Sequence, residues 1–198
     1  MSSSGRRRGL LVVISGPSGA GKTSICDALL TRDPQAVWSV SATTRPPRGG
    51  EAGGSSYEYT SRAEFEARRE RGEFLEWAEY VGQLYGTPAA PVFEAREAGR
   101  DVVMEIDVQG GAQVAERVPE SVRVFVLPPT MESLKARLEG RRTESAEQLS
   151  KRLAEADGEI GFARDSGKYN HFVVNDVLED TIEEIAGIIE AEREKLPT

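Results

Sequence analysis

Eight residues near the amino terminus have the types and spacing of a phosphate-binding loop. The segment Gly16-Pro-Ser-Gly-Ala-Gly21-Lys22-Thr23 matches the pattern G-x-x-x-x-G-K-[ST]. Glycines let the backbone approach an anion closely, and successive N–H groups at the start of a following helix surround its oxygens. The lysine supplies charge to the terminal phosphates, and the threonine hydroxyl can bind Mg²⁺. We therefore expect a nucleoside triphosphate to bind Gly16, Ser18, Gly19, Ala20, Gly21, Lys22, Thr23 and Ser24.

A second group of residues suited to phosphate follows this loop. Arg45 and Arg48 are three residues apart in the sequence TTRPPR, where the two prolines restrict the backbone. One guanidinium group can bind two phosphate oxygens at once through parallel N–H groups. Tyr57 offers a hydroxyl donor nearby in the sequence. Taken alone, the same pattern is also typical of a solvent-exposed basic loop.

Carboxylates and a basic segment complete the inventory of polar groups. Glu105 and Asp107 lie at the carboxyl end of the apolar segment 102–106, and acids at such a strand end, beside a phosphate loop, suit Mg²⁺. We predict a metal site at Thr23 and Glu105, with Glu105 binding the ion directly or through water. Residues 135–152 hold six basic and three acidic side chains, which indicates a site for a compact anion on an otherwise acidic protein.

The elements that must position these groups alternate along the chain. Short apolar runs predict strands at residues 10–14, 37–40, 74–80, 101–106, 122–127 and 173–174. Capping residues and helical periodicity predict helices at 22–30, 61–71, 130–139, 146–165 and within residues 176–198. Thr87-Pro88 predicts a further helix start, with Thr87 as its N-cap, and residues 41–56 predict a long loop. This alternation favours an α/β fold with a mostly parallel sheet.

Length and composition exclude several classes of protein. The chain has 198 residues, a formal charge of −8, one cysteine (Cys26) and one histidine (His171). These values fit a single domain without a disulfide framework or a Cys/His zinc site. No apolar run approaches the roughly 18 residues of a membrane span, and the acidic charge disfavours nucleic-acid binding. We expect a cytoplasmic protein, not a membrane protein, with a disordered tail over residues 1–9.

Several motifs in order along the chain resemble the guanylate kinase family. They are SVSATTRPPRGGE-x₅-Y, EFLEWAEY, YGT, MEIDVQG, LEGRRTES, KRL at 151–153 and VVND at 173–176. The resemblance covers about residues 10–195. It implies Mg²⁺-dependent transfer of the γ-phosphoryl group of ATP to GMP or dGMP, giving ADP and GDP, with no obligate protein partner.

The resemblance also implies a role for individual residues. Arg45, Arg48, Tyr57 and Tyr85 match positions that hold the GMP phosphate, and Ser41, Glu76 and Thr87 match positions that face guanine. Guanine presents two N–H donors on one edge, which a carboxylate can accept together, whereas adenine lacks that pair. Glu105 and Asp107 match positions near the monophosphate and the metal. The catalytic cations implied are Lys22, Arg48, Arg137, Arg141 and Arg152. Asn175 matches a position near the adenine base, although an N-cap role for it is equally consistent with the sequence.

The fold implied is a three-layer α/β core of the P-loop NTPase type with a parallel sheet. Into this core are inserted a GMP-binding region with a small mixed sheet, at residues 41–87, and a helical lid at 135–165. The core then comprises residues 10–40, 88–134 and 166–198.

The sequence disfavours three other functions. A catalytically inactive guanylate-kinase-like module that binds proteins is disfavoured, because Gly16, Gly21, Lys22 and Thr23 are all present. An enzyme with another acceptor is disfavoured by Ser41, Glu76 and Thr87 occurring together. A regulatory GTPase would need an N-K-x-D type motif, and VVND at 173–176 lacks the lysine.

Overall fold

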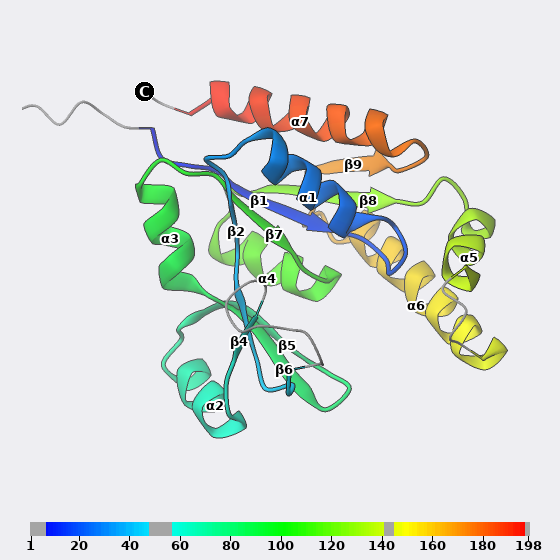
Figure 1. The fold of residues 1–198 in the computed structure, drawn as a ribbon, viewed down its shortest axis with the longest axis horizontal. Helices are drawn as coiled ribbons and strands as arrows, with labels where there is room; N and C mark the ends of the chain where they lie inside the picture. Colours follow the sequence, from blue (N-terminus) through cyan, green and yellow to red (C-terminus); the bar gives the residue numbers. More distant parts are fainter. Residues whose placement is uncertain (1–6, 48–56, 141–144, 197–198) are drawn as a thin grey trace, which may run out of the picture.

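A computed structural model describes residues 7–47, 57–140 and 145–196 of the chain. Its larger sheet is fully parallel and has the strand order β2-β7-β1-β8-β9 (Figure 1). Buried Val, Ile and Leu dominate the inner strands, as expected for strands covered on both faces. The strands are β1 (Leu11–Ser15), β2 (Val37–Trp38), β7 (Val102–Glu105), β8 (Val122–Leu127) and β9 (His171–Val174).

Helices cover both faces of this sheet, so the core has three layers, as predicted. On one face α1 (Lys22–Arg32) and α7 (Leu178–Glu194) pack on β1 and β8 (Figure 1). On the other face lie α3 (Ala89–Glu97) and α4 (Val108–Arg117), which bury Val92 and Val114 against β1 and β7.

A second, smaller sheet is inserted between β2 and α3. It has the order β4-β3-β6-β5 and is mixed, because β3 pairs parallel with β4 while the other pairs are antiparallel. The helix α2 (Arg62–Glu70) covers it through Phe65, which stacks on Phe74 with ring centroids 4.4 Å apart. The strands are β3 (Ser41–Thr43), β4 (Tyr57–Tyr59), β5 (Phe74–Tyr80) and β6 (Gln83–Pro88).

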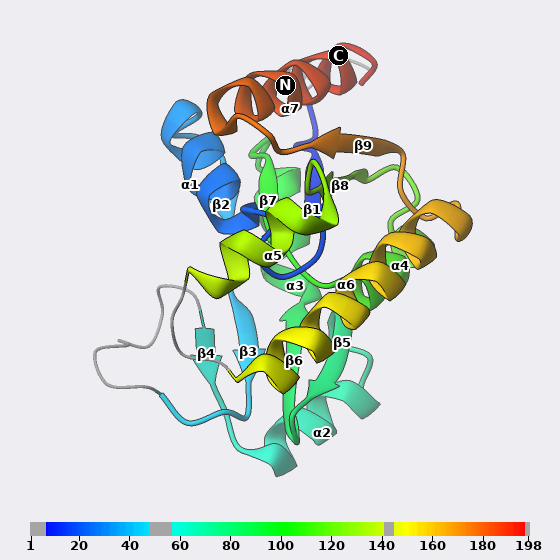
Figure 2. The same cartoon turned by 90° about the vertical axis from the view of Figure 1, so that its right-hand side faces the viewer.

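Two helices form an arm that extends from the core. Figure 2 shows α5 (Met131–Glu139) and α6 (Ala146–Asp165) on the side that faces the viewer. Leu134 and Leu138 of α5 pack against Ala156 of α6. Ala163 near the end of α6 packs with Phe125 of β8. Both helices begin with capping boxes, at Thr130 and at Ser145, and both have the predicted bounds. Within the described residues, no helix is long and apolar enough to cross a membrane.

The structure corrects four local predictions. The strand expected at 37–40 ends at Trp38, and the segment 41–43, expected as loop, forms β3 because it pairs with β6. Thr87 is not an N-cap, because its hydroxyl donates to Glu76 and α3 begins after Pro88. Asn175 is not an N-cap either, since α7 begins after Val177. The helix α4 was not predicted.

Residues 8 and 9, which precede the predicted start of the domain, bond to α3. The N–H of Gly9 donates to the carbonyl of Arg96 over 2.7 Å, and Arg8 lies 2.8 Å from Glu97. Residues 7–9, which we assigned to the tail, are therefore tied to α3, while residues 1–6 are outside the described residues.

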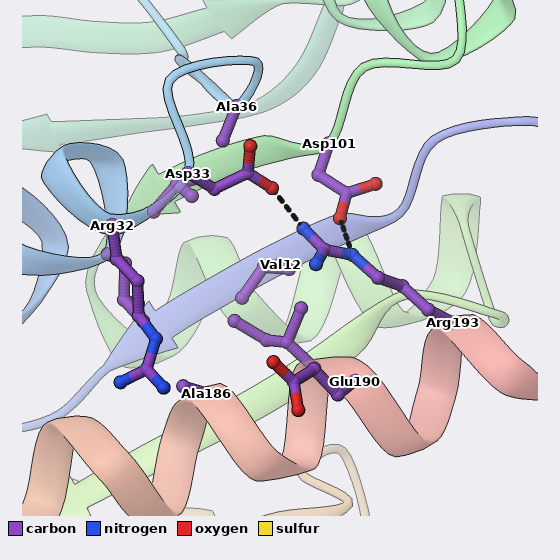
Figure 3. Close-up of a pocket in the computed structure, with 11 residues that line it drawn as sticks. Val12, Arg32, Asp33, Ala36, Asp101, Ala186, Glu190 and Arg193 are labelled. Carbon is purple, nitrogen blue, oxygen red and sulfur yellow. Dashed lines mark hydrogen bonds and ion pairs between the residues drawn. The ribbon is translucent and has the colours of Figure 1, made fainter.

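A cluster of charges closes the amino end of the large sheet (Figure 3). Arg193 of α7 bonds both Asp33, which follows α1, and Asp101, which precedes β7, the latter over 2.6 Å from Nε to Oδ2. The other oxygen of Asp101 accepts the N–H of Leu10 over 2.8 Å. Asp33, Asp101 and Arg193 line a cavity of about 360 Å³. Their hydrogen bonds join α1, β7 and α7 at the end of the sheet opposite the phosphate loop.

Candidate active site

The phosphate loop connects β1 to α1 and has a backbone that requires glycine. Gly16 and Gly21 have φ angles of 148° and 94°. A Cβ at Gly16 would lie 2.4 Å from the carbonyl oxygen of Val126, and one at Gly21 would lie 2.3 Å from Nδ2 of Asn175. Residues 16–21 therefore form a tight turn that aims the N–H groups of the first turn of α1 at one point.

Lys22 lies at the first position of α1 and turns back over this loop. Its Nζ donates to the carbonyls of Gly16 over 2.6 Å and Pro17 over 3.1 Å. Burial lowers the pKa of Lys22, and the nearby carboxylates of Glu105 and Glu159 oppose that shift. The ammonium group is thus held at the loop by hydrogen bonds and by negative charge from two other elements.

Thr23 and Glu105 meet where α1 begins and β7 ends. The hydroxyl of Thr23 lies 3.1 Å and 3.0 Å from the two carboxylate oxygens of Glu105, and both residues line one pocket with Ser18, Lys22 and Ser24. These oxygens fit Mg²⁺, which binds one or two protein oxygens and completes its shell with phosphate and water. Among the described residues, no three His, Cys, Asp or Glu side chains gather to hold a metal by themselves.

The arm of α5 and α6 contacts the phosphate loop from outside the sheet. Arg152 of α6 donates to Oγ of Ser18 over 2.6 Å. Arg137 of α5 donates to the carbonyl of Asn175 over 2.8 Å. The side chain of Asn175 is buried and donates to the carbonyl of Ala20 over 2.7 Å, so it supports the loop from behind. Arg141 lies outside the described residues.

A buried carboxylate with hydroxyl neighbours lies in the small sheet. Glu76 of β5 is directly opposite Thr87 of β6, whose Oγ1 donates to Oε1 of Glu76 over 2.7 Å. Oγ of Ser41 is 3.4 Å from the same hydroxyl. Burial raises the pKa of Glu76 to about 7, with a further contribution from the charge of Asp107. These three residues, which we name the Glu76 cluster, bring one buried carboxylate and two hydroxyl groups together.

Aromatic rings and an arginine gather on the same small sheet. The guanidinium of Arg45 is 5.5 Å from the ring centroid of Tyr57 and 5.8 Å from that of Tyr59. Tyr85 meets Tyr57 edge to face, with centroids 6.2 Å apart. Three of the four residues expected to hold a monophosphate are therefore neighbours, and the fourth, Arg48, lies outside the described residues.

Asp107 lies between the phosphate loop and the Glu76 cluster. It is the N-cap of α4, and its Oδ1 accepts the N–H of Gly110 over 2.7 Å. Its charge acts on the pKa values of both Lys22 and Glu76. The hydrogen bond to Gly110 explains the orientation of the Asp107 side chain. This bond uses Oδ1 and does not involve Oδ2.

Three further residues lie near these groups and were not predicted from the sequence. Tyr59 shares Arg45 with Tyr57. Gln113 of α4 bonds both the N–H and the carbonyl of Trp77 next to Glu76, over 3.2 Å and 2.9 Å. Glu159 of α6 is partly buried, and burial raises its pKa to about 7. Glu159 could have been identified from the sequence, because it lies seven residues after Arg152 and so on the same face of α6.

Comparisons with known proteins agree with one another. The profile of the family described as "Guanylate kinase" matches residues 8–192. The guanylate kinase of Halalkalibacterium halodurans is 46% identical over 194 residues, covering 96% of this chain and 94% of that protein. That of Rubrobacter xylanophilus is 49% identical over 183 residues, covering 92% of this chain and 94% of that protein. The crystal structure of guanylate kinase from Anaplasma phagocytophilum superposes with a TM-score of 0.75 at 31% identity, covering 96% of this chain and 89% of that one.

Proposed function

The chain belongs to the guanylate kinase family, and we propose that its two polar regions bind ATP and GMP for the transfer of a phosphoryl group between them. The reaction gives ADP and GDP. The observation that carries this proposal beyond the family relationship is the Glu76 cluster. Its buried carboxylate faces hydroxyls, and none of its described contacts is a cation.

On the donor side, the loop residues 16–24 bind the phosphates of ATP. Backbone N–H groups of the loop, together with Lys22, stabilise the negative charge of the β- and γ-phosphates. When bound, Mg²⁺ supplies further neutralisation of these phosphates, and Thr23 and Glu105 are the residues that would hold it. Asn175 orients the loop through Ala20, beside the position proposed for the adenine base.

On the acceptor side, Arg45, Arg48, Tyr57 and Tyr85 hold the GMP phosphate, and Ser41, Glu76 and Thr87 bind guanine. A carboxylate offers acceptors only, so it matches the N1–H and N2–H donors of guanine. Adenine would leave this buried group without donors, which makes discrimination strong. None of these residues is assigned to the ribose 2′-hydroxyl, so we propose dGMP as a second acceptor.

The arm of α5 and α6 supplies cations to the transferring group. Two bound nucleotides are polyanions that repel each other, so the arginines Arg137, Arg141 and Arg152 stabilise the charge in the transition state. The contact of Arg152 with Ser18 shows that this arm reaches the loop. We propose that the arm and the small sheet close over the substrates, which excludes water and limits ATP hydrolysis.

A coupled assay of ADP release tests the proposal. Purified protein is incubated with ATP, Mg²⁺ and one of GMP, dGMP, AMP, CMP or UMP. Turnover with GMP and dGMP, hardly any with the others, and none when EDTA removes Mg²⁺ is the expected result. Turnover with AMP would contradict the assignment of Glu76. Folded protein that turns over none of the monophosphates would instead support the inactive interaction module.

A further inference from the structure

Two adjacent glycines occupy the first turn of α4, where glycine is unfavourable. Gly110 and Gly111 are the third and fourth residues of α4, after its N-cap Asp107, and neither has a positive φ. Their backbone conformation is therefore open to any residue, and glycine in a helix interior destabilises it relative to alanine. The reason for glycine at these positions must lie in the space around them.

At Gly110 that space is filled by the carboxylate of Glu76. A Cβ built at Gly110 would lie 2.9 Å from Oε2 and 3.4 Å from Cδ of Glu76. Three other helical glycines, Gly158, Gly161 and Gly187, have nothing within 4 Å of the same position. The close approach is therefore a local property of the first turn of α4, where a Cβ at Gly111 would also lie 2.2 Å from the hydroxyl of Tyr169. It is not a general property of the helices.

The carboxylate has little freedom to move away from an added methyl group. Glu76 is 6% exposed, and its Oε1 is fixed by the hydroxyl of Thr87 at 2.7 Å. The backbone next to it is fixed as well, because Gln113 of α4 bonds both the N–H and the carbonyl of Trp77. A side chain at position 110 would therefore rotate the carboxylate or separate α4 from β5.

We propose that Gly110 is a positioning residue for guanine recognition, because its missing side chain fixes where Oε2 of Glu76 lies. This inference rests on the proposed function and deepens it, since it adds a residue of α4 to the determinants of base specificity. Recognition by two parallel N–H···O bonds depends on the position of both carboxylate oxygens, so a shift of a few tenths of an ångström weakens the pair.

The variant Gly110→Ala tests this directly, with Gly187→Ala as the matched control for helix propensity. Both variants are assayed with ATP and either GMP or IMP, whose base lacks the 2-amino donors of guanine. For Gly110→Ala we expect kcat/KM for GMP to fall about 10- to 100-fold, mainly through KM, and the preference for GMP over IMP to shrink. The KM for ATP stays within about twofold of the wild-type value. Gly187→Ala should keep wild-type kinetics.

A double-mutant cycle separates positioning from a general loss of structure. Glu76→Asp shortens the side chain by one methylene and withdraws the carboxylate from position 110. If the contact is the cause, Gly110→Ala changes kcat/KM for GMP much less in the Glu76→Asp background than in the wild type. Equal effects in both backgrounds, or an unchanged ratio of GMP to IMP in Gly110→Ala, would overturn the inference. Wild-type protein without GMP turnover would instead overturn the proposed function.

Discussion

Two carboxylates in this protein are almost equally buried but have opposite surroundings. Asp101, at the amino end of β7, is 5% exposed, and Glu76, in the small sheet, is 6% exposed. Asp101 accepts a backbone N–H and bonds the guanidinium of Arg193 at 2.6 Å (Figure 3). Glu76 accepts hydrogen bonds from the hydroxyl and the backbone N–H of Thr87 but has no described cation beside it, and the nearby charge of Asp107 is also negative.

We interpret the difference as one between a structural charge and a charge that is available for a ligand. Removing a carboxylate from water is costly unless a cation and hydrogen bonds compensate for it. Arg193 supplies that compensation for Asp101 and joins three elements in doing so. Glu76 lacks a comparable described partner, which raises its pKa, and the donors of a bound guanine would supply the compensation.

The largest expected effect comes from Glu76→Gln, which removes the charge without changing the shape. The new amide places an N–H₂ donor opposite a donor of guanine, so we expect kcat/KM for GMP to fall about 100-fold or more. The KM for ATP should change little, because the phosphate loop is a separate region. Steady-state kinetics with each substrate varied in turn checks this. A loss confined to ATP would contradict the assignment.

Asp101→Asn should have the opposite effect, lowering stability while leaving the kinetics with GMP nearly unchanged. The amide oxygen can still accept the N–H of Leu10, but Arg193 loses one of its two carboxylates. We expect the free energy of unfolding to fall by about 2 kcal/mol, with kcat/KM for GMP within about threefold of the wild type. Urea denaturation and steady-state kinetics at one temperature measure the two quantities. A variant that is stable but inactive would show that the charge cluster also serves catalysis.

The pH dependence of GMP binding provides a finer test. Protonation of Glu76 destroys its acceptor pair, and its pKa is raised to about 7 by burial. GMP affinity should therefore fall about tenfold between about pH 8 and about pH 6. Calorimetric titration of wild type and Glu76→Gln at both pH values isolates this effect, since the phosphate of GMP and Glu159 titrate in both proteins. Parallel pH profiles would contradict it.

The raised pKa of Glu76 also determines how this residue changes the stability of the folded protein with pH. The pKa of Glu76 in the folded protein lies above the ordinary value of 4.5, so the folded state binds the proton more tightly than the unfolded state. The contribution of this carboxyl to stability is present below pH 4.5 and is lost as the pH rises through about 7. Glu76→Gln should accordingly raise the melting temperature at about pH 8 relative to the wild type.

The smallest expected effect is that of Thr87→Val. This change removes the hydroxyl that donates to Glu76 and leaves the carboxylate less well satisfied. We expect kcat/KM for GMP to fall about three- to tenfold, through KM. Thr44→Val is the control and should stay near wild type, because Thr44 directly follows β3 of this sheet but is bonded to Gln83 and Leu84. Equal losses in the two variants would point to a general disturbance of the sheet.

Features encoded by neighbouring residues were predictable from the sequence. The phosphate loop lies within eight residues, and the bounds of α5 and α6 follow from capping residues that act on the next turn. The α/β class and the parallel sheet also followed from local patterns, because apolar runs alternate with helical segments. The three layers were implied by the family resemblance.

Features that depend on pairing of distant segments were not predictable in the same way. Thr87 precedes a proline and has the pattern of a helix start, but pairing of β5 with β6 directs its hydroxyl to Glu76. The helix α4 escaped prediction because two glycines weaken its first turn, and the reason for Gly110 appears only when Glu76 is beside it. The role of Glu76 itself came from a family resemblance, since a lone glutamate in a strand carries no such signal.

The most direct test of the account is the protonation state of Glu76 with and without GMP. Protein labelled with ¹³C at glutamate carboxyls is titrated by NMR from about pH 4 to about pH 9, and Glu76→Gln assigns the resonance. We expect Glu76 to titrate with a pKa of about 7 in the free protein. Saturating GMP, but not AMP, should lower it by at least about one unit, because N–H donors favour the charged form. A titration near pH 4.5 in the free protein, or one that GMP leaves unchanged, would contradict the claim that this carboxylate is kept for guanine.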